Sequence, residues 1–70
     1  MKTDKMKMQI AIARKKMTSM QLADAAGLST VTVGRLLGGA SVAPITAGKV
    51  AEALGVDVTD IIDMEEVAVQ

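Results

Sequence analysis

Apolar residues recur along the 70-residue chain at the spacings of short amphipathic helices, but the first such segment fits two patterns. Between residues 5 and 16, alternate positions are apolar as in a strand, and a second set of positions fits one helical face. The strand set is Met6, Met8, Ile10 and Ile12, and the helical set is Met8, Ala11, Ile12 and Lys15. The alanines and the basic C-terminal turn favour a helix, because cations complement its carbonyl-rich end. Residues 1–5 are polar and are expected to be frayed.

The segment from residue 19 to residue 39 predicts two short helices joined by a tight turn. Thr18 or Ser19 can cap the first helix, which runs to about residue 26, and Gly27 follows where a left-handed C-cap is expected. Ser29 is the next N-cap, and the second helix continues through about residue 37. The inward positions of the pair are Leu22, Ala23, Ala26, Val33 and Leu36. Packing must hold the second helix, because its β-branched residues and Gly34 lower its helix propensity.

The second half of the chain predicts a longer helix after a loop. Two glycines at positions 38 and 39 end the preceding helix, and residues 40–45 form an extended loop. Thr46 is expected to cap the next helix, which ends at Gly55. Its inward positions are Val50, Ala51 and Leu54.

The C-terminal part predicts one more short helix and a tail. Asp57 or Thr59 starts that helix, which contains Ile61 and Ile62. Seventy residues suffice for one small domain with little core to spare. We place the folded domain at residues 1–63 and expect the acidic tail, residues 64–70, to be flexible.

The composition excludes several classes of site. The chain has no Cys and no His, which removes disulfides, thiolate metal sites and the commonest general base. No paired carboxylates and no phosphate-binding loop are evident, so we expect no enzyme activity, no metal, no cofactor and no small-molecule ligand. No segment approaches the length of a membrane span, and the N-terminus lacks the apolar core of a signal peptide. We therefore expect a cytoplasmic protein.

The formal net charge of zero conceals an asymmetry between the two halves. Residues 1–35 carry seven bases against two acids, a net of +5, and residues 36–70 carry one base against six acids, a net of −5. The seven bases are Lys2, Lys5, Lys7, Arg14, Lys15, Lys16 and Arg35. This separation suggests a polyanion as partner of the basic half. The alternative is that these residues are solvated helix faces.

Several residues at fixed spacing carry a resemblance to a known family. They are Leu22 and Ala23, Gly27 at the turn, Val33 and Leu36, Gly39, and the run VAEALGVDVTDII over residues 50–62. Over about residues 10–62 the chain resembles the Cro/cI phage-repressor type of helix-turn-helix domain, the XRE-like family. The resemblance implies an all-α, lambda-repressor-like bundle of about five short helices from a phage or a prokaryote, with its motif at residues 19–39.

The resemblance also implies that the protein is a sequence-specific, double-stranded DNA-binding regulator of transcription, with a repressor as the expected type. The second motif helix would lie in the major groove with its outer residues at the base edges. These base-reading positions are Thr30, Val31, Thr32 and Arg35. Arg35 can donate two hydrogen bonds to guanine, and the methyl groups of the other three can pack on thymine. The alternative is a solvated Arg35 and β-branched residues that cover a neighbouring helix.

Phosphate contacts are expected at both ends of the motif. At its start, the first helix presents free N–H groups, and Lys16 just before it can add charge or simply cap the preceding helix. The residues concerned are Thr18, Ser19 and Met20. The loop after the second helix often carries Lys or Arg in the family, whereas residues 40–45 carry no charge here. Main-chain N–H groups near Gly39 and Ala40 are then left for phosphates.

The resemblance finally suggests a homodimer on a partly palindromic operator. The apolar residues expected at the two-fold contact are Val56, Val58, Ile61 and Ile62, and the alternative is that they complete the small core. A different class of function is also open: a protein–protein interaction module or antitoxin-type domain that keeps the fold with weak or no DNA binding. The neutral loop after the second motif helix is compatible with that alternative.

Overall fold

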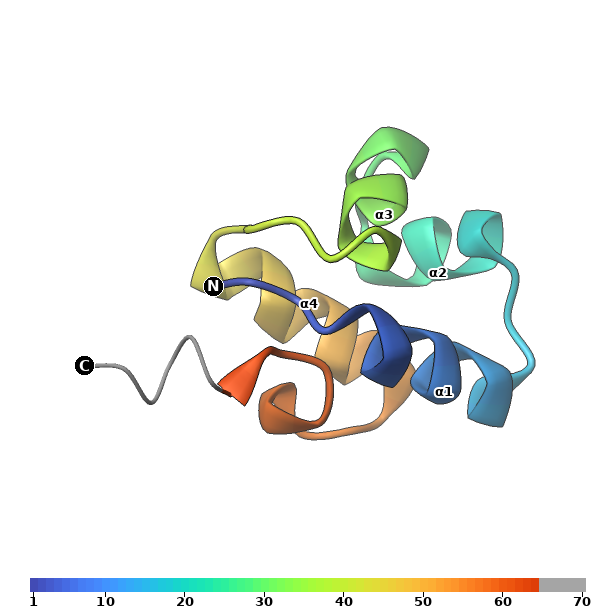
Figure 1. Ribbon diagram of the computed structural model, residues 1–70. Coiled ribbons are helices and arrows are strands. Elements are labelled where there is room, and N and C mark those ends of the chain that lie inside the picture. Colours follow the sequence, from blue (N-terminus) through green and yellow to red (C-terminus); the bar gives the residue numbers. More distant parts are fainter. Residues whose placement is uncertain (65–70) are drawn as a thin grey trace.

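The computed structural model describes residues 1–64, which form four α-helices and one turn of 3₁₀ helix (Figure 1). They are α1 (Lys5–Lys15), α2 (Ser19–Ala26), α3 (Thr30–Leu37), α4 (Pro44–Leu54) and the 3₁₀ turn η1 (Val58–Asp60). The ambiguous segment 5–16 is thus helical, and the predicted all-α fold is confirmed. The predicted flexible tail, residues 64–70, lies outside the described residues except for Met64. Within residues 1–64, no helix is both long and apolar enough to cross a bilayer.

The core consists of aliphatic side chains contributed by all four helices and the C-terminal segment. α2 packs against α3 and α4, and α1 packs against α3, α4 and η1. The buried apolar residues are Met8, Ala11, Leu22, Ala23, Ala26, Val33, Leu36, Ala47, Val50, Ala51, Leu54, Ile61 and Ile62. Every inward position predicted for α2, α3 and α4 is in this set. Val33 and Leu36, both 0% exposed, anchor α3 to the domain and leave its opposite side outside.

The start of α4 differs from the prediction. The helix begins at Pro44, and its N-cap, Ala43, makes no side-chain capping bond. Thr46 lies inside the helix and does not cap it. Proline is well suited to the first helical position, because its fixed φ is helical and the N–H that it lacks would have no partner there.

The N-terminal segment is paired on both sides, so the prediction that residues 1–5 are frayed is wrong. Met1–Asp4 run as an extended segment between residues 40–42 and residues 61–63. Lys2 is bridged to Ser41 and Thr3 to Ile62 in antiparallel fashion. Four main-chain hydrogen bonds of 2.6–3.2 Å fix this arrangement.

Thr3 is the centre of this arrangement. It is 1% exposed and is the only polar residue that is buried in the described part of the chain. Its hydroxyl lies 2.8 Å from the Leu36 carbonyl oxygen and 3.2 Å from the Ala40 carbonyl oxygen. The N-terminal segment is therefore fastened to the C-terminal end of α3.

The C-terminal segment also differs from the prediction. Asp57 is the cap, but it starts a three-residue 3₁₀ turn, and Ile61 and Ile62 follow that turn. The two isoleucines are 0% and 2% exposed in the single chain. They complete the core, as the alternative interpretation held, and have no free surface to offer to a second copy.

Candidate nucleic-acid interface

The N-terminus of α2 is closed by a reciprocal pair of hydrogen bonds. The Thr18 hydroxyl accepts a hydrogen bond from the Gln21 N–H at 3.1 Å, and the Gln21 side chain accepts one from the Thr18 N–H at 2.8 Å. The sequence allowed either Thr18 or Ser19 as the N-cap of α2, and the structure shows that Thr18 is the cap. The N–H groups of Ser19 and Met20, at the first two helical positions, have no partner within the helix.

The turn between α2 and α3 is set by a glycine and a serine. Gly27 ends α2 with φ 69°, in the left-handed region that a side chain resists. The Leu28 N–H then donates to the Ala23 carbonyl at 2.8 Å. Ser29 caps α3 by accepting from the Thr32 N–H at 3.1 Å. These local bonds confirm the predicted geometry of two helices joined by a tight turn.

The outer face of α3 carries three of the four predicted base-reading residues. Thr30, Val31 and Arg35 are exposed, and Val31 reaches 66% exposure. The Arg35 guanidinium makes no hydrogen bond or ion pair with the described part of the chain. Gly34 lies between them along the helix, and a methyl group added there would meet no atom within 4 Å. This face of α3 is therefore open to solvent and carries one long cationic side chain, that of Arg35.

Thr32 is placed differently from the other three. It is only partly exposed, and its hydroxyl lies 2.9 Å from the Ser29 hydroxyl. The Thr32 hydroxyl is thus already engaged at the N-terminal cap of α3.

Lys16 stands just before α2 in an uncommon backbone conformation. Its φ of 55° makes it the only non-glycine residue with positive φ in the described part of the chain. The comparable C-caps of α2 and α4 are both glycine. Lys16 is exposed and lies two residues before the Thr18 cap, so its position is compatible with the predicted phosphate contact.

The N–H groups of Gly39 and Ala40 are not free, which corrects the prediction that they bind phosphate. The Gly39 N–H donates to the Leu36 carbonyl at 3.2 Å, and the Ala40 N–H donates to the Arg35 carbonyl at 3.0 Å. Both bonds close the C-terminal end of α3. The reason is general, because the last carbonyls of a helix need donors and the residues that follow supply them.

Lys2 of the N-terminal segment and Lys5 at the start of α1 lie beside this same loop, and the sequence analysis did not predict that position. Lys2 stands opposite Ser41 in the bridge, and a Cβ placed on Gly39 would lie 3.7 Å from the Cβ of Lys5. Both lysines are exposed. No local signal identifies these neighbours, because they are more than 30 residues apart in the chain.

Three other bases lie away from the motif, near the acidic part of the chain. The Lys7 ammonium lies 3.4 Å from the carbonyl oxygens of Thr59 and Ile62. The Lys15 side chain lies against Gly55. Arg14 lines a hollow of about 220 Å³ between α1 and residues 56–60. The bases of residues 1–35 are therefore not all gathered on the surface that carries the outer face of α3.

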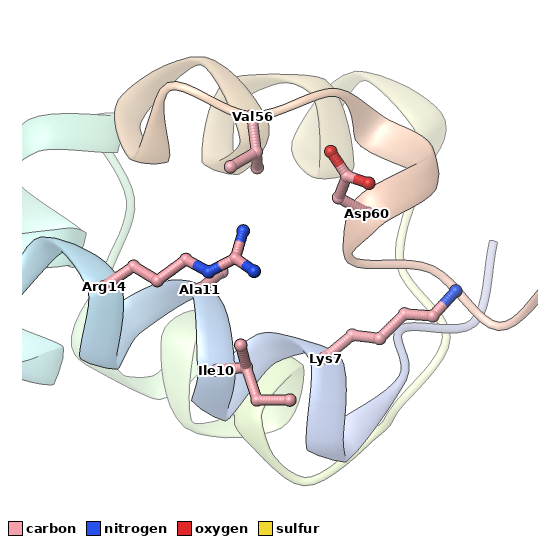
Figure 2. A pocket seen from close by; sticks show the side chains of 6 residues that line it. All are labelled: Lys7, Ile10, Ala11, Arg14, Val56 and Asp60. Atoms are coloured by element: carbon pink, nitrogen blue, oxygen red, sulfur yellow. The ribbon is translucent and has the colours of Figure 1, made fainter.

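That hollow is open and of mixed character (Figure 2). Its lining residues are Lys7, Ile10, Ala11, Arg14, Val56 and Asp60. It contains one carboxylate and two cationic side chains, with no second acid beside Asp60. Across residues 1–64, no group of three or more His, Cys, Asp or Glu residues could hold a metal ion.

The remaining predicted contact residues, Val56 and Val58, are partly buried against the core. Val56 also lines the hollow shown in Figure 2. Of the four residues predicted for a dimer contact, these two keep some surface that is free in the single chain.

The fold and the open face of α3 define a helix-turn-helix domain of the DNA-binding class. A family model described as the Cro/C1-type HTH DNA-binding domain matches residues 7–66, and the chain belongs to this family. A search of curated proteins gave no significant match.

Two similar solved structures are variants of 2-hydroxyethylphosphonate dioxygenase. One is 35% identical with a TM-score of 0.79 and aligns with 90% of this chain. The other is 34% identical with a TM-score of 0.76 and aligns with 86% of this chain. This chain covers only 14% of each dioxygenase chain, so the likeness concerns one small region of a much larger protein.

Proposed function

We propose that this domain is a sequence-specific regulator of transcription that acts as a repressor and reads the major groove with α3. The observation that carries the proposal is the outer face of α3, on which Arg35 is exposed and has no side-chain partner among the described residues. An arginine in this position can donate two parallel hydrogen bonds to guanine O6 and N7. Thr30 and Val31, one turn earlier, can pack their methyl groups on thymine.

The start of α2 supplies the expected phosphate contact on the other side of the turn. The N–H groups of Ser19 and Met20 lie at the positive end of the helix dipole and are not used within the helix. The exposed Lys16 adds a full positive charge two residues before the helix cap. Phosphate contacts of this kind set the register of the domain on the duplex, and base contacts then specify the sequence.

Two copies bind a partly palindromic operator in this proposal. The domain is small, and one eight-residue helix reads few base pairs. Two recognition helices about 34 Å apart would meet successive major grooves on one side of the duplex. Val56 and Val58 are the residues that we propose for the contact between copies. The proposed place of action is the cytoplasm, where the DNA of a prokaryote or an infecting phage is found.

The test is selection of bound sites from a pool of random duplexes, followed by titration of the selected duplex by fluorescence anisotropy. We expect enrichment of one motif in two inverted half-sites, and affinity that falls as salt rises. Arg35→Ala, on the reading face, should lose the preference for the selected duplex over a shuffled one. Absence of enrichment, with no binding to any duplex at low salt, would contradict the proposal.

A second candidate function is a protein–protein interaction module without enzyme activity of its own. It is favoured by the likeness to a region of an enzyme chain, and by the loss of the Gly39 and Ala40 N–H groups as phosphate donors. The same titration separates the two candidates. An interaction module would be folded and monodisperse but would show no salt-dependent binding to DNA.

A further inference from the structure

The loop that follows α3 has no charged side chain of its own with which to bind a DNA phosphate. Residues 40–45 carry no charge, and the N–H groups of Gly39 and Ala40 are occupied by α3 itself. α3 has eight residues and is about 12 Å long, which is close to the width of the major groove at about 12 Å. The residues beside its C-terminal end should therefore come near the sugar–phosphate backbone, where positive charge is needed.

The structure supplies positive charge there from another part of the chain. Met1–Asp4 pair with residues 40–42, which brings Lys2 opposite Ser41. Directly opposite residues of an antiparallel pair point to the same side, so Lys2 shares the solvent side of Ser41, while Thr3 points into the core. Lys5, in the first turn of α1, has its Cβ beside Gly39.

We propose that Lys2 and Lys5 form a second phosphate-binding site, which takes the DNA backbone at the C-terminal end of α3. The two ammonium groups provide the charge that the loop lacks, and both side chains are exposed and have no partner within residues 1–64. The proposal rests on the DNA-binding function proposed above. It adds a contact with the DNA backbone at the C-terminal end of α3, opposite the phosphate contact proposed at the start of α2.

The site is held in place by Thr3. Its buried hydroxyl bonds to the Leu36 and Ala40 carbonyls, and its N–H donates to the Ala40 carbonyl at 3.2 Å. The lysines on either side of it are thus fixed to the end of α3. A charge that is fixed at its point of use loses less conformational entropy on binding than one on a free chain end.

The experiment measures affinity for the selected duplex at several salt concentrations for the wild type, Lys2→Ala, Lys5→Ala and the double variant. Each phosphate contact contributes about 0.9 to the slope of log affinity against log salt. We expect each single variant to reduce the magnitude of the slope by about 0.9 per bound copy and the double variant by about 1.8 per bound copy, on the selected and shuffled duplexes alike. Lys7→Ala is the matched control on the same helix, because its ammonium faces Thr59 and Ile62, and its slope should equal that of the wild type.

The outcomes separate this inference from the function on which it rests. If the wild type binds no duplex, the DNA-binding function fails, and this site fails with it. If the wild type binds and the double variant keeps the wild-type slope, only the Lys2–Lys5 site is overturned. A slope that falls equally in Lys7→Ala would show a general charge effect and would also overturn the site. Far-UV circular dichroism checks that each variant is folded.

Discussion

The Lys15 side chain lies along the C-terminal end of α4, where a Cβ on Gly55 would be 3.4 Å from Lys15 Cε and 3.5 Å from Lys15 Nζ. The Lys15 side chain is exposed, but its end lies beside the residue that caps α4. Its neighbour Lys16 is exposed and has no such contact. The two adjacent lysines therefore have different surroundings, which makes them a natural pair for comparison.

Lys16→Gly should make the domain more stable and weaken its binding to DNA. At φ 55°, a side chain in the left-handed region costs about 1–2 kcal/mol, which glycine avoids, although glycine also gains entropy in the unfolded chain. We expect a net gain of about 1 kcal/mol, or roughly 4–8 °C in Tm for a domain of this size. Loss of the Lys16 charge should lower the affinity for the selected and the shuffled duplex alike. Thermal melting and anisotropy measure the two effects on the same sample.

Lys15→Ala is the control for that substitution. It removes the same charge one residue earlier, but from a side chain that lies at α4, so duplex affinity should stay within about twofold of the wild type. Equal losses of affinity in Lys15→Ala and Lys16→Gly would contradict the assignment of the phosphate contact to Lys16.

Arg35→Ala should weaken binding to the selected duplex by about 1–3 kcal/mol and relax discrimination at one base pair. The reason is that the proposed bidentate contact to guanine would be lost, whereas the fold should be unaffected, because the Arg35 guanidinium has no partner in the part of the chain that the structure describes. Titrations against duplexes with each base pair exchanged in turn locate the affected position. Arg35→Lys is the matched variant: if Arg35 only meets phosphate, lysine should restore binding, and the base-reading role would be wrong.

Thr18→Ala and Ser19→Ala should have different effects on stability, because only Thr18 caps α2. Thr18 holds the reciprocal bonds with Gln21, so its loss should lower the free energy of unfolding by about 0.5–2 kcal/mol. Ser19 makes no such bond and is exposed, so Ser19→Ala should leave stability within about 0.5 kcal/mol of the wild type. Urea denaturation measures both. A larger loss for Ser19→Ala than for Thr18→Ala would mean that the cap is wrongly placed.

The difference between what could and could not be predicted follows the range of the interactions. The bounds of α2 and α3 depend on Thr18, Gly27 and Ser29, whose bonds reach residues within four or five positions, so the sequence pattern is enough. The pairing of the N-terminal segment joins residues separated by 39 and 59 positions, as in Lys2 with Ser41 and Thr3 with Ile62. Local polarity carries no information on such pairing.

The misplaced features of the second half have a different cause. At the start of α4, two local signals compete: Thr46 as a cap and Pro44 as a first helical residue, and the structure follows the proline. The outer face of α3 was predictable as a surface, because Val33 and Leu36 fix the inward side of that helix. The engagement of Thr32 with Ser29 was not, since it depends on a side-chain rotamer. The sequence thus predicts which face of α3 is exposed, and the structure adds the position and partners of the individual side chains on that face.

Asp57→Asn should reduce the loss of stability at low pH. The pKa of the Asp57 carboxyl is lowered from its usual 3.8 because it accepts hydrogen bonds from the Thr59 N–H and then from the Thr59 hydroxyl. A lowered folded-state pKa means that this contribution is present above about pH 4 and is lost as the pH falls through the folded-state value. Asparagine can keep the capping bond without titrating. Urea midpoints of the two proteins should differ most at neutral pH and converge as the pH falls below the folded-state pKa of Asp57; a constant difference would rule out this linkage.

Gly27→Ala and Gly34→Ala should change stability in opposite directions, although both add one methyl group where no atom lies within 4 Å. Gly27 has φ 69°, which alanine adopts at a cost of about 1–2 kcal/mol, so that variant should melt at a lower temperature. Gly34 lies inside α3 with helical φ, where alanine is preferred by about 0.8–1 kcal/mol, so that variant should melt at a higher temperature. Calorimetry on the two variants and the wild type decides. If both are destabilised, some contact around Gly34 opposes the added methyl group, and the open face of α3 is not as free as its surroundings indicate.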